Sequence, residues 1–275
     1  MTNETIDREN PQTLFSDGGL AEFAETLAND AALMSMSWFR KRIDAELKAD
    51  CSPVTQADRE IEASIRNKIA ENYPDHGILG EEYGRLNLDA RHVWVVDPID
   101  GTRSFITGWP IWGTLVCLLQ DGKPELGIID MPALGERWKA TRGNPTCFYS
   151  AQGNVEICQT SACRSLEIAR FYTTSLFYFE NSDRPKIEKI AKSSATPRFG
   201  GDCYSYGLLA SGHVDLVVEA LLQPFDYFAL VPIIEGAGGV ITDWNGQPLA
   251  IGSDGRVVAA ATPQLHAEVL QILRA

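Results

Sequence analysis

The stretch that decides the fold of this chain reads Trp94-Val95-Val96-Asp97-Pro98-Ile99-Asp100-Gly101-Thr102. An apolar strand ends there in two carboxylates, Asp97 and Asp100, and Gly-Thr follows at once. A hard divalent cation such as magnesium prefers oxygen ligands at about 2.0–2.1 Å and often shares them with substrate phosphate. The carboxylates therefore suit a metal, and the N–H groups of Gly101 and Thr102 suit phosphate oxygens. The alternative is an ordinary surface turn, because Asp-Pro and Asp-Gly also mark turns.

Two other segments carry carboxylates in a similar setting. Ile78-Leu79-Gly80-Glu81-Glu82 is a short apolar run that opens into adjacent carboxylates, and Pro224-Phe225-Asp226 precedes a helical stretch. In an α/β fold, ligands gather at the carboxyl ends of strands, so these segments can converge on one site. Their number favours a metal site over a turn.

Taken in order, these motifs resemble the inositol monophosphatase family of magnesium-dependent, lithium-sensitive phosphatases. The matching segments are Ser52-Pro53-Val54-Thr55 with Ala57-Asp58, Gly80-Glu81-Glu82, Asp97-Pro98-Ile99-Asp100-Gly101-Thr102 and Phe225-Asp226, and they extend over about residues 48–239. An ordered set of motifs is far more specific than any single one. Within the family, the segments Glu82-Tyr83-Gly84, Arg103-Ser104-Phe105-Ile106-Thr107-Gly108 and Gly200-Gly201-Asp202 are most similar to the histidinol-phosphate phosphatase branch.

The resemblance implies a layered αβαβα sandwich, a homodimer, and two or three magnesium ions. By this resemblance, Asp97 bridges two ions, Glu81 and the main-chain oxygen of Ile99 complete one site, and Asp100 and Asp226 complete the other. Thr102 would orient the nucleophilic water with help from Asp58 and Glu81, and the Gly101 and Thr102 N–H groups would hold phosphate. Glu82 is interpreted either as a support for these ligands or as an ordinary loop charge.

Asp58 also has a purely structural interpretation. Thr55 and Asp58 stand three apart at the start of a predicted helix over residues 55–73, which is the spacing of a capping box. The resemblance favours a role for Asp58 in supporting the nucleophilic water.

The substrate is inferred from two further carboxylates and one cation. By the resemblance, Glu219, seven residues before Asp226, and Asp202 lie where the leaving alcohol binds. Two carboxylates suit a protonated amine, which favours histidinol phosphate over inositol phosphate. Alternatively, Asp202 caps a helix at residues 204–210 and Glu219 is an ordinary strand-end charge. Arg103 replaces the Thr or Lys common in the family, and it either assists phosphate binding or pairs with a local carboxylate.

The rest of the chain alternates helical and strand patterns, which is typical of an α/β protein. Helices are predicted from residue 20 toward 39, with Asp17 as N-cap, and over 186–193, 204–210, 227–235 and 264–273; strands are predicted over 93–96, 113–119, 126–130, 136–141, 146–149, 169–173, 214–218 and 257–261. The turn Asp121-Gly122-Lys123-Pro124 predicts an antiparallel hairpin. The polar stretch 151–154 is expected to divide an N-terminal lobe, residues 1–154, which carries metal-binding motifs, from a C-terminal α/β lobe, residues 155–275, which completes the metal and substrate site.

Composition and charge exclude several classes of partner. The 275 residues carry a net charge of −13, which disfavours nucleic acid because its phosphates would be repelled. No apolar run approaches the ~20 residues that span a bilayer, and no secretory signal is visible, so we expect a soluble protein without a membrane partner. The six cysteines form no Cys-x-x-Cys pair and are interpreted as reduced thiols of a cytoplasmic protein.

Other catalytic mechanisms fit the chain less well. Cys158 and Arg164 have the spacing of a thiolate phosphatase, but no glycine lies between them to let backbone amides wrap phosphate. A phosphatase with an aspartate nucleophile would need carboxylates two residues apart, whereas Asp97 and Asp100 are three apart. The prediction is therefore a magnesium-dependent phosphomonoesterase acting on histidinol phosphate by direct attack of water. An inositol-1-phosphate phosphatase is the main alternative, followed by a noncatalytic metal-binding regulator.

Overall fold

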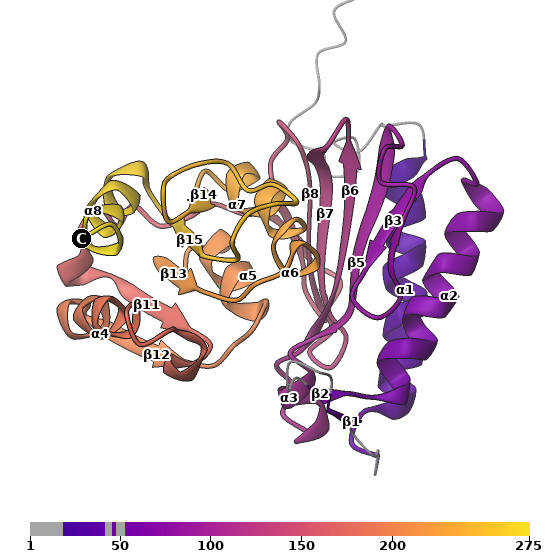
Figure 1. Ribbon diagram of the computed structural model, residues 1–275, viewed down its shortest axis with the longest axis horizontal. Helices are drawn as coiled ribbons and strands as arrows, with labels where there is room; N and C mark the ends of the chain where they lie inside the picture. Colours follow the sequence, from indigo (N-terminus) through magenta and orange to yellow (C-terminus); the bar gives the residue numbers. More distant parts are fainter. Residues whose placement is uncertain (1–18, 42–45, 48–52) are drawn as a thin grey trace, which may run out of the picture.

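Five layers follow one another across the molecule in the order helix, sheet, helix, sheet, helix (Figure 1). The computed structural model describes residues 19–41, 46–47 and 53–275. From the first layer to the last, the helices are α1 (Leu20–Trp38) and α2 (Gln56–Asn72), then α5 (Tyr204–Ala210), α6 (Pro224–Tyr227) and α7 (Leu230–Gly236), then α4 (Arg184–Ser193) and α8 (Pro263–Leu273). The predicted αβαβα sandwich is confirmed.

The first sheet has eight strands in the order β10-β9-β8-β7-β6-β5-β3-β4. Their bounds are β3 (Gly77–Gly80), β4 (Gly84–Leu86), β5 (His92–Asp100), β6 (Gly113–Gln120), β7 (Lys123–Met131), β8 (Glu136–Thr141), β9 (Cys147–Tyr149) and β10 (Val155–Ile157). Neighbouring strands are antiparallel except for β3 and β5, which run parallel. The predicted hairpin joins β6 to β7, and its two turn residues, Asp121 and Gly122, both have positive φ, as a type I′ turn requires.

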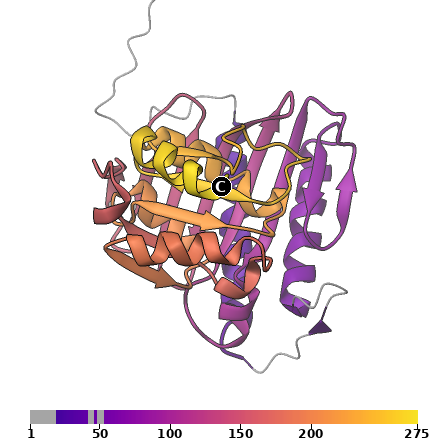
Figure 2. The same cartoon turned by 60° about the vertical axis from the view of Figure 1, so that its left-hand side comes forward.

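The second sheet has five strands in the order β12-β11-β13-β15-β14. Their bounds are β11 (Arg170–Thr173), β12 (Thr196–Phe199), β13 (Leu216–Glu219), β14 (Val240–Asp243) and β15 (Val257–Ala260). Figure 2 shows α4 and α8 in front of this sheet, on the face turned away from the first sheet. Shorter elements complete the fold: the strand pair β1 (Glu46–Leu47) and β2 (Pro53–Val54), helix α3 (Thr102–Ile106), and the 3₁₀ helices η2 (Leu166–Ile168) and η3 (Leu176–Tyr178).

Three apolar clusters hold the layers together. One joins α1 and α2 to the first sheet, and the isoleucines Ile61, Ile65 and Ile69 on the inner face of α2 are almost fully buried in it. A second fills the space between the sheets around α5 and α7, and a third lies beneath α4 and α8. The central cluster draws residues from both halves of the chain, so the halves pack into one continuous body.

Most predicted elements are found, with differences that have local causes. The predicted helix 227–235 is wrong as a single helix, because Pro232 has no N–H and its ring would clash with the carbonyl four residues earlier. The chain forms α6 and α7 instead. The edge strand β12 escaped prediction because it is exposed at every position and contains Pro197, which is tolerated at a sheet edge. The predicted N-cap Asp17 lies outside the described residues.

The expected lobe boundary falls in a turn of the first sheet. Residues 151–154 connect β9 to β10, and both strands pair in the eight-stranded sheet. The chain reaches the second sheet at β11, beyond Ile157. Among the described residues, no helix combines the length and the apolar character needed to cross a bilayer.

Candidate metal centre

The end of β5 is irregular, and this irregularity brings two carboxylates together. In a regular strand, residues three apart point to opposite faces, so Asp97 and Asp100 would diverge. The pairing of β5 with β6 shifts register between these two residues. Pro98 lies inside the irregular stretch and offers no N–H to the ladder, while its carbonyl accepts the Thr114 hydroxyl at 2.8 Å. A bulge of this kind redirects side chains, and here it lets Asp100 approach Asp97.

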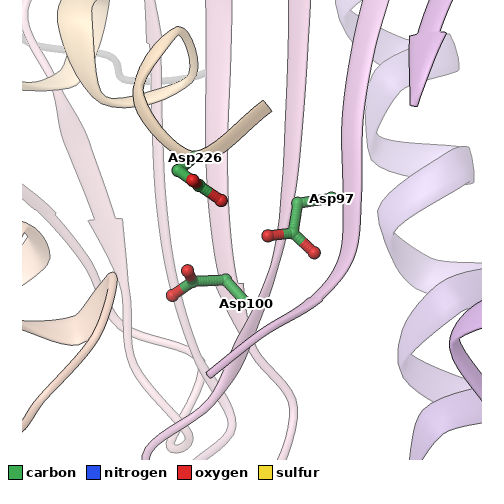
Figure 3. A group of neighbouring side chains, drawn as sticks. All are labelled: Asp97, Asp100 and Asp226. Atoms are coloured by element: carbon green, nitrogen blue, oxygen red, sulfur yellow. The ribbon is translucent and has the colours of Figure 1, made fainter. Parts of the chain in front are cut away.

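A third carboxylate reaches the same place from α6. Oxygen atoms of Asp97, Asp100 and Asp226 all lie within 4.8 Å of one another. Figure 3 shows the three side chains directed toward one another, with Asp226 arriving from the helix layer between the sheets. Asp97 is buried, and the other two are partly exposed. The structure therefore brings together three of the predicted ligands.

Backbone N–H groups hold each of these carboxylates by one oxygen. The Ile99 N–H donates to Asp97 Oδ1 at 3.0 Å, and the Cys203 N–H donates to Asp100 Oδ2 at 2.7 Å. Asp226 forms a capping box at the start of α6, where its Oδ2 accepts the Gln223 N–H at 2.6 Å. Because backbone donors fix the side chains, the cluster is organised before any ligand arrives.

The electrostatics of the cluster favour a cation. Burial raises the pKa of Asp97 well above its usual value, and the charges of Glu81, Asp100 and Asp226 raise it further. The pKa of Asp226 is raised well above its usual value by burial and next by Asp100, and burial also raises the pKa of Asp100. The largest charge contributions to Asp97 thus come from other carboxylates. An all-oxygen donor set with this mutual repulsion fits a hard divalent cation, which would relieve the repulsion.

Asp58 and Glu81 lie beside the cluster. Asp58 does form the predicted capping box: its Oδ2 accepts the Thr55 N–H at 2.8 Å and the Thr55 hydroxyl at 2.6 Å. Its other oxygen is buried without a hydrogen-bond partner. Burial raises the Asp58 pKa to about 6 despite the Thr55 hydrogen bonds, and the charge of Glu81 contributes to the rise. The capping and site interpretations of Asp58 are therefore compatible, since each uses a different oxygen.

The Gly-Thr segment turns directly into α3. The Thr102 hydroxyl donates to the Ile99 carbonyl at 3.1 Å, so the residue predicted to orient water contacts the main-chain oxygen predicted to bind metal. Gly101 has φ +83°. A Cβ at this position would lie 2.8 Å from Asp202 Oδ2, so glycine is needed here both for conformation and for space.

Gly101→Ala should therefore lower the free energy of unfolding by about 1–3 kcal/mol and also reduce phosphatase activity. Gly143→Ala is the matched control, because Gly143 has φ +80° but open space around its Cβ position. Urea unfolding measures the loss of stability in both variants. The loss in Gly143→Ala reports backbone strain alone, and any additional loss in Gly101→Ala reports the clash with Asp202. Equal losses of stability and unchanged activity in both variants would contradict the prediction.

The two carboxylates predicted to contact the substrate lie close together. Asp202 accepts the Ser104 hydroxyl at 2.8 Å, and Cys203 is the residue that precedes α5 as its N-cap, without a side-chain cap. The capping interpretation of Asp202 is therefore wrong, because its side chain turns toward Ser104 instead. Burial and then Asp100 raise the Asp202 pKa to about 7.

Glu219 lies at the end of β13 and is buried. Its Oε1 accepts the N–H and the hydroxyl of Thr174 at 2.6 and 2.9 Å. Burial raises its pKa to about 8, and the charge of Asp202 adds to the rise. Glu219 thus accepts hydrogen bonds from Thr174 and Thr173, which an ordinary exposed charge at a strand end would not have.

Arg103 and Tyr178 lie near Asp202 and Glu219, and Tyr178 was not predicted from the sequence. Burial raises the pKa of Tyr178, and Arg103 acts to lower it, while Asp202 and Glu219 act to raise it, so Tyr178 lies near all three charged groups. Ser104 and Glu62 were also missed; Glu62 is fully buried on α2 beneath Glu82. The spacing of Asp58, Glu62 and Arg66 at every fourth position was a signal that could have singled out Glu62.

Comparisons with known proteins identify the family of this chain. A family model described as the inositol monophosphatase family matches residues 19–275. The bifunctional phosphatase IMPL2, chloroplastic, of Arabidopsis thaliana is 44% identical over 280 residues, which cover 98% of this chain and 79% of that protein. A histidinol-phosphatase of Mycobacterium tuberculosis is 35% identical, with 85% of this chain and 88% of that protein covered.

A solved structure of an inositol monophosphatase from Zymomonas mobilis has a TM-score of 0.83 and 43% identity to this chain. The match covers 93% of this chain and 97% of the other. Since the family model spans all the described residues and these relatives are similar over most of their length, the chain belongs to the inositol monophosphatase family of phosphatases.

Proposed function

We propose that the protein is a magnesium-dependent histidinol-phosphate phosphatase. The observation that carries the phosphatase part is the meeting of Asp97, Asp100 and Asp226 oxygens within 4.8 Å, beside the Gly101-Thr102 turn. Glu81, Asp97, Asp100, Asp226 and the main-chain oxygen of Ile99 would hold two or three magnesium ions. Bound magnesium would neutralise phosphate charge and lower the pKa of water.

The residues around the cluster have properties that suit direct attack by water. Asp58 presents a buried oxygen without a hydrogen-bond partner, and its pKa of about 6 lies near neutral pH, where a general base is most effective. Glu81 lies near enough to act on Asp58, and Thr102 would help to orient the water. The N–H groups of Gly101 and Thr102 stand at the first turn of α3, where donors have no acceptor within the helix, and would hold phosphate.

The choice of histidinol phosphate depends on Asp202 and Glu219. Burial raises the pKa values of Asp202 and Glu219, and the charge of Asp202 raises that of Glu219 further. An ammonium group bound between them would offset the cost of burial and relieve this repulsion, so the pair favours a positively charged substrate. A polyol such as inositol offers no charge for this purpose. Arg103 adds a cation beside the pocket and would assist in binding phosphate. A relative called histidinol-phosphatase supports this substrate, whereas the similar Zymomonas mobilis structure supports the alternative, inositol 1-phosphate.

Phosphate release from L-histidinol phosphate and from inositol 1-phosphate, each with magnesium or with excess chelator, tests the proposal. We expect chelator to abolish activity and kcat/KM to be at least about tenfold higher for histidinol phosphate. A charge-assisted hydrogen bond contributes about 1.5–3 kcal/mol, so Asp202→Asn should lower kcat/KM for histidinol phosphate by about 10–100-fold.

The control for this variant is Asp215→Asn, which removes a carboxylate that pairs with Arg170 at 2.7 Å at the opposite end of β13. It should leave the substrate preference unchanged. Faster turnover of inositol 1-phosphate by the unaltered protein would contradict the histidinol-phosphate part, and turnover without divalent cation would contradict the magnesium part.

The homodimer and the cytoplasmic location remain predictions from the resemblance and the cysteines. The Arabidopsis thaliana relative is called chloroplastic, a compartment different from the one predicted for this chain. Sedimentation of the purified protein would measure the oligomeric state.

A further inference from the structure

We infer that Glu62 and Arg66 are positioning residues that shape the turn after β3 and thereby set the affinity of the centre for divalent cation. The inference rests on the proposed function, because that proposal makes Glu81, in the same turn, a metal ligand. Neither Glu62 nor Arg66 belongs to the cluster of ligands itself. Their role is carried by contacts to the backbone on either side of Glu81.

The Glu62 carboxylate is fully buried and accepts two backbone N–H groups of this turn. Its Oε2 accepts the Glu82 N–H at 2.6 Å, and its Oε1 accepts the Tyr83 N–H at 3.1 Å. Arg66, one helical turn further along α2, donates from Nε to the same Oε1 at 2.7 Å. Charge-assisted hydrogen bonds of this kind are the strong ones, so the turn is held tightly against α2.

Glu62 and Arg66 also contact the two ends of the turn. A Cβ at Gly80 would lie 2.1 Å from Glu62 Oε1, so the carboxylate occupies the space beside the last residue of β3. At the other end, Arg66 Nη2 donates to the Gly84 carbonyl, and its guanidinium lies 6.0 Å from the centre of the Tyr83 ring. The backbone is thus held before Glu81, directly after it, and at Gly84.

The held turn determines where the Glu81 carboxylate points. The charge of Glu81 raises the pKa values of Asp58, Asp97 and Asp226, so its carboxylate lies near the cluster. Metal ligands must lie within about 0.2 Å of ideal distances, so a small rotation of this turn weakens binding. Residues that orient ligands without touching the metal typically change metal affinity by about 10–100-fold when replaced.

The test is Glu62→Gln in the full chain. Glutamine keeps the size of the side chain, but its NH₂ group faces either a backbone N–H or the Arg66 guanidinium, both of which are donors. Isothermal titration with Mg²⁺ alone should show a dissociation constant raised by about 10–100-fold. The Mg²⁺ concentration for half-maximal phosphate release should rise in parallel, whereas kcat at saturating Mg²⁺ should stay within about threefold of the original value.

Ile65→Val is the matched control, because Ile65 is buried on the same helix and does not contact the turn through a hydrogen bond. It should lower the melting temperature in chelator without changing the Mg²⁺ dissociation constant. Arg66→Gln is a second test should Glu62→Gln fail to fold, because it removes the contact to Gly84 and leaves the Glu62 carboxylate. Its Mg²⁺ dissociation constant should rise at least about fivefold.

Distinct results separate the two proposals. This inference alone would be overturned if the unaltered protein binds Mg²⁺ and Glu62→Gln or Arg66→Gln binds it equally well. The inference would also be overturned if Ile65→Val weakened Mg²⁺ binding as much as Glu62→Gln does for the same loss of melting temperature. Glu62 and Arg66 would then have a purely structural role. Absence of Mg²⁺ binding by the unaltered protein would overturn the proposed function, and this inference with it.

Discussion

Asp97→Asn should reduce phosphatase activity by at least about a thousandfold, because Asp97 is the buried member of the carboxylate cluster and the proposed bridge between ions. Removing one preorganised electrostatic contact commonly costs about 10²–10³ in kcat, and loss of a bridging ligand affects more than one contact. The measurement is phosphate release at saturating magnesium, with the fold of the variant checked by circular dichroism.

The same variant should also separate metal binding from folding. Magnesium at about 100 times its dissociation constant should stabilise the unaltered protein by about 2.7 kcal/mol per site, or about 5–10 °C in melting temperature. Asp97→Asn should lose this gain, yet melt in chelator at the same temperature or slightly higher, since the substitution removes a source of repulsion. Asp215→Asn, the control, should retain the gain from magnesium. A full magnesium-dependent gain in Asp97→Asn would contradict the assigned ligand.

The metal-free protein should become less stable as pH rises from about 4.5 to 8. Burial raises the pKa of Asp58 from its usual 3.8 to about 6, that of Asp202 from 3.8 to about 7, and that of Glu219 from 4.5 to about 8. At any pH between a group's pKa in the unfolded chain and its higher pKa in the folded chain, the folded chain binds more protons than the unfolded chain. The free energy of unfolding therefore falls with rising pH, by up to about 1.4 kcal/mol per pH unit for each such group.

Melting temperatures in chelator at constant ionic strength measure this fall, which should reach at least about 5 °C between pH 5 and pH 8. Glu219→Gln should reduce the slope, because it removes the group whose pKa is about 8. Asp215→Asn should leave the slope unchanged: hydrogen bonds from Arg170 and Ser161 lower the Asp215 pKa, so its contribution is lost only below this window. A melting temperature that rises between pH 5 and pH 8 would contradict the prediction.

The sequence by itself determined the family and the chemistry of its motifs. Local patterns sufficed wherever the cause was local: the isoleucines of α2 repeat with the period of a helix, and Thr55 and Asp58 form the capping box that their spacing predicts. The β6–β7 hairpin likewise follows from the Asp-Gly turn. The order of the carboxylate motifs along the chain was enough to indicate a phosphatase of this family.

Tertiary structure alone decided which side chains meet and what supports them. Asp100 is held by the N–H of Cys203, 103 residues away, and Asp202 bonds Ser104 instead of capping α5. The sequence shows Glu62 only through its helical spacing with Asp58 and Arg66, because its importance lies in backbone groups of a turn twenty residues further on. Such contacts have no local period to reveal them; they arise because packing of helices and sheets against one another brings distant segments within hydrogen-bond distance.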